Sequence, residues 1–175
     1  MRDWNMHLEK PMNLPEFKEG VHYRQLRGGK YRFELIVDVT FEIPELAKSG
    51  HDKNVSFCDC MRWEWVRINR TLYTIKKGYR WNGCSPKRWI PIIGWVGTVD
   101  FDSTRLASCF HDTGFQFFRV ADYPLTFDQI NGVFFNIMAA LKFRFANIYY
   151  DAVCRFGKCF SSKFPERGEH SIILS

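Results

Sequence analysis

The chain has 175 residues, of which 46% are hydrophobic and 25% charged, proportions that are typical of a folded protein. They exclude a disordered or low-complexity chain, and the length favours one domain. Aromatic residues reach 17%, more ring surface than a core of this size needs, so we expect some rings to face a partner or a cleft.

The net charge of +6 permits an anionic partner without indicating one. No stretch is apolar over the roughly 18 residues that a membrane helix needs, and the N-terminus lacks the apolar segment of a secretory signal. We therefore expect a protein made in a cytoplasm, with no membrane partner. In that compartment the six cysteines are expected to be reduced thiols.

The N-terminal residues 1–20 contain Pro11, Pro15 and Gly20 and show no sustained hydrophobic period. This pattern predicts an extended N-terminal arm, because proline interrupts regular structure. Such an arm is hard to order by itself, so we expect it to pack on another chain. Residues 21–175 are then predicted to form a single α+β domain.

Strand patterns follow the arm. Residues 31–43 alternate in polarity and are rich in β-branched and aromatic side chains, which predicts one long strand. Residues 55–69 and residues 72–75 are predicted to form the two strands of a hairpin, and residues 76–78 the turn that leaves it.

In the C-terminal half the hydrophobic period becomes helical. A first helix capped by Ser103 or Thr104, a second starting at Thr126 and a third over about residues 146–156, ended by Gly157, are predicted. Strands first and helices later indicate an α+β fold, with N-terminal antiparallel strands followed by about three C-terminal helices.

Candidate site residues come from a turn, the first helix and the start of the second helix. They are the binding candidates Asn82, Ser85 and Arg88 and the catalytic candidates His111, Asp112 and Asp128. A histidine can serve as a base and carboxylates can bind a cation or substrate. We expect His111, Asp128 and residues 81–85 to share a pocket. In the alternative, His111 packs under the sheet, hydrogen-bonded to Asp128 or to the turn.

The same segments resemble an uncharacterised phage and prophage family, domain of unknown function 1353, over residues 78–157. The matching positions are Gly78, Tyr79, Gly83, Ser85 and Pro86 in the turn, Ala107, His111, Asp112 and Phe115 in the first helix, and Asp128, Met138, Tyr149, Tyr150, Val153, Phe156 and Gly157 after it. The resemblance implies the fold and a phage context, but no established reaction.

The chain departs from that family at Asn82, where the family has aspartate, and at Cys84, where it has alanine. A carboxamide carries no negative charge and weakens a site for hard cations. We therefore expect no cofactor and no tightly held metal, with a divalent cation kept open as an alternative. His111 is expected to titrate near its ordinary pKa of about 6.5.

The His111–Asp112 pair, with Cys109 before it and Phe115 after it, is also similar to the helix of secreted phospholipases A2. In those enzymes the histidine activates water and the aspartate holds calcium, which implies a small hydrolase with His111 as general base. Residues 81–86 reproduce little of the glycine-rich calcium loop of that family.

Three further patterns have ordinary interpretations. Trp63 and Trp65 share one strand face, which indicates a core face or a subunit contact rather than a nucleic-acid platform. Cys58 and Cys60, even with His51 nearby, lack the spacing of a zinc site. The phenylalanine-rich stretch of residues 134–145 is predicted to be core.

Taken with the phage resemblance, these patterns predict a virion-associated structural or accessory component of tail or particle assembly. It would be made in the host cytoplasm and located in the virion. Its aromatic-rich contacts would be with other phage structural proteins or with itself as a homo-oligomer, and nucleic acid is not an expected partner. The alternatives are the small hydrolase, with Asp112 or Asp128 binding cation or substrate, and a host-directed binding protein.

Overall fold

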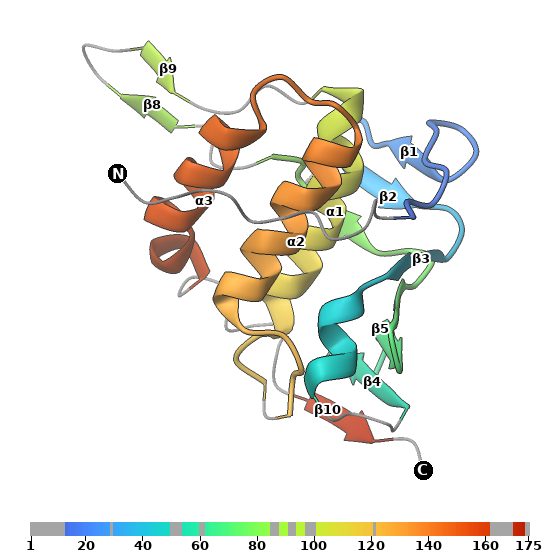
Figure 1. The fold of residues 1–175 in the computed structure, drawn as a ribbon. Helices are drawn as coiled ribbons and strands as arrows, with labels where there is room; N and C mark the ends of the chain where they lie inside the picture. The colour runs from blue at the N-terminus through green and yellow to red at the C-terminus, as the bar shows by residue number, and fades with distance from the viewer. Residues whose placement is uncertain are drawn as a thin grey trace.

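The computed structural model describes residues 13–28, 30–49, 54–59, 62–84, 88–90, 94–96, 101–120, 122–161 and 170–173. Antiparallel sheets occupy the N-terminal half and three helices follow, so the α+β prediction is confirmed (Figure 1). The helices are α1 (Asp102–Phe117), α2 (Phe127–Ala140) and α3 (Ala146–Ser161).

The described strands form two main sheets and a small hairpin. The three-stranded sheet has the order β1 (Tyr23–Gln25), β2 (Phe33–Leu35), β7 (Arg80–Trp81). The five-stranded sheet has the order β10 (His170–Ile173), β4 (Val55–Cys58), β5 (Glu64–Asn69), β6 (Leu72–Ile75), β3 (Val39–Glu42). The hairpin joins β8 (Arg88–Ile90) to β9 (Gly94–Val96), and a 3₁₀ helix, η1, spans Pro44–Ser49.

The predicted long strand over residues 31–43 is wrong, because the chain changes sheets in its middle. β2 pairs with β1 and β7, whereas β3 pairs with β6. Between them, the Asp38 carboxylate accepts a hydrogen bond of 2.8 Å from the Lys77 backbone N–H and forms an ion pair with Lys76. These contacts stabilise the segment between β2 and β3, where the chain leaves one sheet and enters the other.

The stretch of residues 55–69 is likewise two strands rather than one. A turn held by Asp59 separates β4 from β5: its carboxylate accepts a hydrogen bond of 3.0 Å from the Trp63 backbone N–H, and its carbonyl one of 2.9 Å from Arg62. Arg62 has a φ of 63°, so the turn is tight. The predicted hairpin is found between β5 and β6.

The helix ends differ partly from the predictions. Phe101 is the N-cap of α1, and Thr104 Oγ1 accepts a hydrogen bond of 3.1 Å from its backbone N–H, so neither predicted residue is the cap. The predicted start of α2 is confirmed, because Thr126 and Gln129 form a reciprocal capping box. α3 continues through Gly157, since a glycine inside a helix lowers its stability without ending it.

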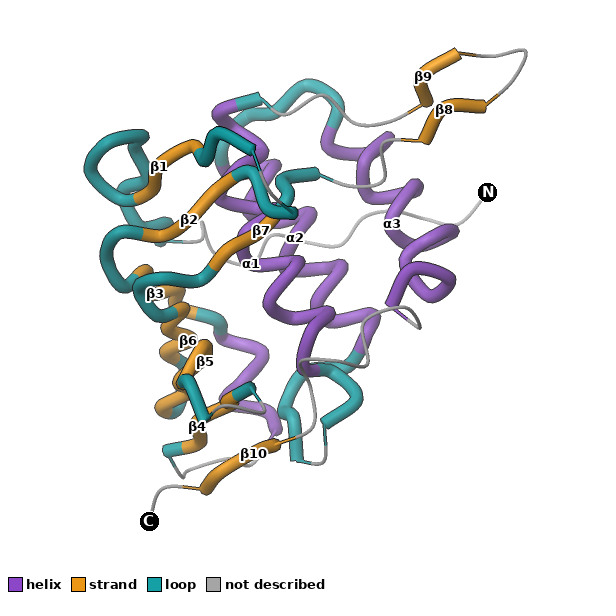
Figure 2. The backbone as a smooth tube through the Cα atoms, turned by 180° about the vertical axis from the view of Figure 1, so that it is seen from behind, coloured by secondary structure: helices purple, strands orange, loops and turns teal. Residues whose placement is uncertain are grey.

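α1 packs on one face of the five-stranded sheet, α2 packs on α1 and α3 on α2; Figure 2 shows the two main sheets on one side of the molecule and these helices on the other, with the β8–β9 hairpin beside α3. Phe110 of α1 meets the sheet residues Phe41 and Tyr73, with ring centroids 5.4 and 5.1 Å apart. A Cβ atom added to Gly114 of α1 would lie 2.8 Å from Ile130 Cγ2. The glycine therefore allows α1 and α2 to approach closely.

Part of the predicted arm packs on its own domain. Leu14 and Phe17 pack against the core, and the Phe17 ring stacks on Tyr23 at a centroid distance of 4.7 Å. For these residues the expectation that the arm packs away from its own domain is wrong, because the Phe17 ring packs on Tyr23 within the domain; packing of the arm on another chain stays a prediction. Residues 1–12 lie outside the described part of the chain.

The described cysteine side chains, those of Cys58, Cys84, Cys109 and Cys154, are free thiols. Cys60 and the side chain of Cys159 lie outside the described part. Among the described helices, none is both long enough and apolar enough to cross a membrane.

Candidate functional site

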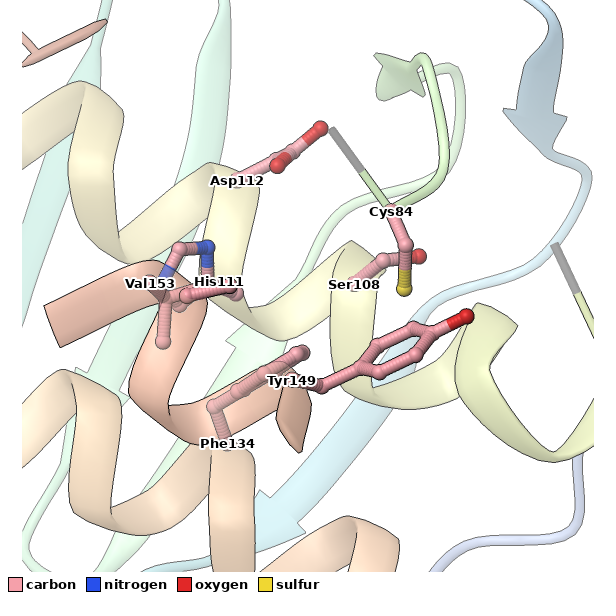
Figure 3. Close-up of a pocket in the computed structure, with 8 residues that line it drawn as sticks. Cys84, Ser108, His111, Asp112, Phe134, Tyr149 and Val153 are labelled. Carbon is pink, nitrogen blue, oxygen red and sulfur yellow. The ribbon is translucent and has the colours of Figure 1, made fainter. Parts of the chain in front are cut away.

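A small pocket opens where α1, α2 and α3 meet the turn that follows β7 (Figure 3). It is lined by Cys84, Ser108, His111, Asp112, Phe134, Tyr149, Ala152 and Val153. Its enclosed space is about 10 Å³, room for about one water molecule and far below the usual range for small-molecule sites. The pocket can therefore take a small group at most.

The turn is fixed to α1 by buried polar contacts. Trp81 donates its indole N–H to Ser108 Oγ at 3.2 Å, and Ser108 in turn donates to the Arg105 carbonyl at 2.9 Å. Gly83 has a φ of 79°, a left-handed conformation that glycine adopts without steric cost. This explains physically why glycine suits that position of the turn, and it places Cys84 against α1.

His111 is buried between aromatic rings. Its ring stacks on Phe115 at a centroid distance of 4.1 Å and lies 4.7 Å from Phe134. Its Nε2 lies 3.0 Å from Oδ1 of the fully buried Asn131. A carboxamide oxygen only accepts, so we assign the proton to Nε2 of a neutral His111.

This environment changes the acidity of His111. Burial lowers its pKa to about 4, although the bond with Asn131 opposes the shift. The expectation of an ordinary pKa is therefore wrong, because water no longer solvates the charged ring. At pH 7 the ring is neutral, its Nε2 proton is bound to Asn131, and only Nδ1 could accept a proton.

The structure separates the two candidate carboxylates. Asp112 is half-exposed and lines the pocket beside His111, with its carboxylate on the side of Cys84 in Figure 3. Asp128 is exposed and is not among the lining residues. It lies near Tyr150 instead: burial raises the pKa of Tyr150 to about 12, and the Asp128 charge adds to that shift.

Of the three candidates in and after the turn, the structure describes the side chain of Asn82. Asn82 is half-buried and does not line the pocket, whereas its neighbour Cys84 does. Ser85 and the side chain of Arg88 lie outside the described part of the chain. Of the four candidates whose side chains the structure describes, it brings His111 and Asp112 together in the pocket and leaves Asn82 and Asp128 outside its lining.

Sequence reasoning missed Asn131, the hydrogen-bond partner of His111. The available signal was a carboxamide within the apolar stripe of α2, between Ile130 and Phe134. Its amide nitrogen lies beside the Cys154 thiol, without the geometry of a well-formed hydrogen bond. Asn131 therefore connects α2 to α1 through its hydrogen bond with His111.

Within the described ranges, no three histidine, cysteine, aspartate or glutamate side chains are grouped as metal ligands. Cys58 is buried in β4, and burial raises the pKa of its thiol, with the charges of Glu64 and Asp59 adding to the effect. His51 and Cys60 are outside the described part.

A second feature is an exposed group of apolar side chains where α1 and α3 begin. Phe101, Phe145 and Ile148 are 40%, 39% and 64% exposed. The rings of Phe101 and Phe145 lie 5.4 and 5.9 Å from the ring of Phe143. We call these four residues the apolar end cluster. The prediction that residues 134–145 are core is wrong for Phe145, which lies at the surface before α3.

Comparisons of the chain with family models, with curated proteins and with solved structures find no match. The resemblances to the phage family and to phospholipases A2 therefore stay predictions. Any function has to be argued from the geometry of this chain.

Proposed function

We propose that the protein is a virion-associated component of a phage particle, made in the host cytoplasm, that contacts neighbouring subunits through aromatic side chains. The observation that carries the proposal is the apolar end cluster. The phage context itself comes from the resemblance over residues 78–157.

The apolar end cluster has the composition of a contact surface. Two phenylalanines, both packed on Phe143, and Ile148, three residues after Phe145, expose large fractions of their side chains, and Arg144 lies over the Phe145 ring at 5.4 Å. Interface centres are enriched in aromatic residues and arginine. Burying about 200 Å² of this apolar surface would contribute on the order of 5 kcal/mol before the costs of association.

Mass spectrometry of purified particles tests the virion assignment. We expect the protein at a fixed copy number in particles purified from the host that carries its gene. Its absence from particles, together with its presence in the infected-cell lysate, would refute the assignment.

Substitution of Ile148 by glutamate tests the contact surface, because Ile148 is its most exposed member and a charge is costly to bury in an apolar contact. The Ile148→Glu protein should remain a folded monomer and fail to enter particles. Val21→Glu is the matched control, since Val21 is 56% exposed but lies outside the cluster. Normal incorporation of Ile148→Glu would contradict the proposed surface.

A small hydrolase is the second candidate, because His111 and Asp112 line one pocket. In this reading Nδ1 of His111 serves as base, and Asp112 binds a divalent cation or the substrate. The His111→Gln protein, whose amide can still donate to Asn131, should then lose ester hydrolysis while remaining folded. Equal hydrolysis by the unmodified and the His111→Gln proteins would exclude this role.

A further inference from the structure

The five-stranded sheet has one face packed on the helices and one face turned outward (Figures 1 and 2). Along β5, Val66 and Ile68 are buried, whereas the alternating residues Arg67 and Asn69 are exposed. Successive side chains of a strand point to opposite faces. Arg67 and Asn69 therefore mark the outer face.

Polar side chains cross this outer face in register, and the buried Ser56 of β4 supports them from beneath through its hydrogen bond to Glu64. Thr40 of β3 pairs with Thr74 of β6, Thr74 pairs with Arg67, and Arg67 pairs with Ser56 of β4. The two threonine hydroxyls lie 2.9 Å apart. Glu64 accepts hydrogen bonds from Arg67 Nε and Nη2, both at 2.8 Å, and a further one from Ser56. We call these five residues the polar row.

Two stacked tryptophans lie on either side of Glu64 in the chain, where β5 begins. Trp63 is 62% exposed, and its ring lies 6.5 Å from that of Trp65 at an interplanar angle of 22°. Asp59 fixes both residues: its Oδ2 accepts from the Trp65 indole at 2.9 Å and its Oδ1 from the Trp63 backbone at 3.0 Å. An exposed ring held in place loses little freedom when a ligand binds.

We propose that the outer face of this sheet binds a neutral oligosaccharide, with a sugar ring stacked on Trp63 and its hydroxyls hydrogen-bonded to the polar row. A pyranose has a face of C–H groups and a rim of hydroxyls that donate and accept. The Trp63 ring can stack on the C–H face of the sugar. The hydroxyl, guanidinium and carboxylate groups of the polar row can form hydrogen bonds with the sugar hydroxyls.

The charges on this face favour a neutral ligand over nucleic acid. Affinity for nucleic acid depends on cations that neutralise phosphates. Here Arg67 is paired with Glu64 and Lys76 with Asp38. A protein partner is also a poor match, because the fully buried centre of a protein interface is depleted of charged residues, whereas the polar row places a guanidinium and a carboxylate there.

An array of neutral oligosaccharides of glucose, galactose, mannose and N-acetylglucosamine tests the proposal, followed by calorimetry with any oligosaccharide that binds. We expect binding to at least one of them, weakened about tenfold or more in Trp63→Ala, as for stacking contacts elsewhere. Thr74→Val should weaken it as well, through the polar row. Leu72→Ala is the matched control, because Leu72 is 43% exposed on the same face and belongs to neither group.

Circular dichroism establishes that each variant is folded. The proposal would be overturned by an absence of binding across the array, or by binding that Trp63→Ala leaves unchanged. Preferential binding of single-stranded DNA that Trp63→Ala abolishes would also overturn it, in favour of nucleic acid. These outcomes are independent of particle incorporation, which tests the apolar end cluster.

Discussion

Acidification from pH 7 to pH 5 should destabilise the folded chain, because His111 is buried and neutral with a pKa of about 4. In the unfolded chain the same ring is solvated and has a pKa of about 6.5. The unfolded state therefore binds a proton first as the pH falls. The contribution of neutral His111 to the free energy of unfolding is therefore fully present above about pH 6.5 and is lost progressively as the pH falls to about 4.

The size of the loss follows from the two pKa values. At pH 5 the unfolded ring is almost fully protonated and the folded ring is about one-tenth protonated, which gives a loss of about 2 kcal/mol relative to pH 7. For a chain of this length the melting temperature should fall by about 5 °C. Burial opposes ionisation of Glu34, Asp38 and Glu64, but hydrogen bonds from basic partners lower the pKa of each carboxyl below its ordinary value. These groups therefore stay ionised in the pH window that reports on His111.

Urea unfolding at pH 7 and pH 5 measures the effect, with His111→Gln as the test variant. Glutamine does not titrate and can still donate to Asn131, so the variant should lose at most a few tenths of a kcal/mol between the two pH values. An unmodified protein equally stable at both pH values would refute the reasoning, as would a His111→Gln protein that keeps the full loss.

Three further predictions concern packing, capping and pairing. Gly114→Ala should lower the free energy of unfolding by about 1–3 kcal/mol, because the added Cβ would lie 2.8 Å from Ile130. Gly132→Ala, whose Cβ would have nothing within 4 Å, should be neutral or slightly stabilising. Urea unfolding of the two variants measures the difference. Thr126→Ala should cost about 1 kcal/mol through loss of the α2 cap, and an equal melting temperature would contradict the capping geometry. Removal of residues 170–175 should leave β4 as an exposed sheet edge and promote self-association, measured by light scattering, whereas removal of residues 174–175 alone should not.

The apolar periodicity, the cap at Thr126 and the short break at residues 70–71 already indicated three helices after a strand-rich half and the β5–β6 hairpin. Thr126 and Gln129 at the start of α2 form a capping box whose partners are three residues apart. The β5–β6 hairpin closes over two residues, with Arg70 at a φ of 53°. Such features depend on contacts between near neighbours, so the α+β class and the helical half could be predicted from the sequence.

The candidate site was predicted only in part. The sequence placed His111 and Asp112 on one helix, but the partner of His111 is Asn131, twenty residues away on α2. The position of Asp128 outside the pocket depends on the rotation of α2 against α1. That rotation is set by close packing at Gly114, which no local pattern reveals.

Tertiary structure alone decided which aromatic residues are covered. Trp63 and Tyr73 both lie in stretches that the sequence predicts to be strands. In the structure, however, Trp63 is 62% exposed and Tyr73 is fully buried against Phe110. The change of sheets at Asp38 was equally hidden, because residues 31–43 suit either sheet and the choice depends on pairing with β7 and β6 far along the chain. Local propensity determines the type of an element, whereas its partners and its exposed face are fixed by long-range burial of apolar surface, which depends on the whole chain at once.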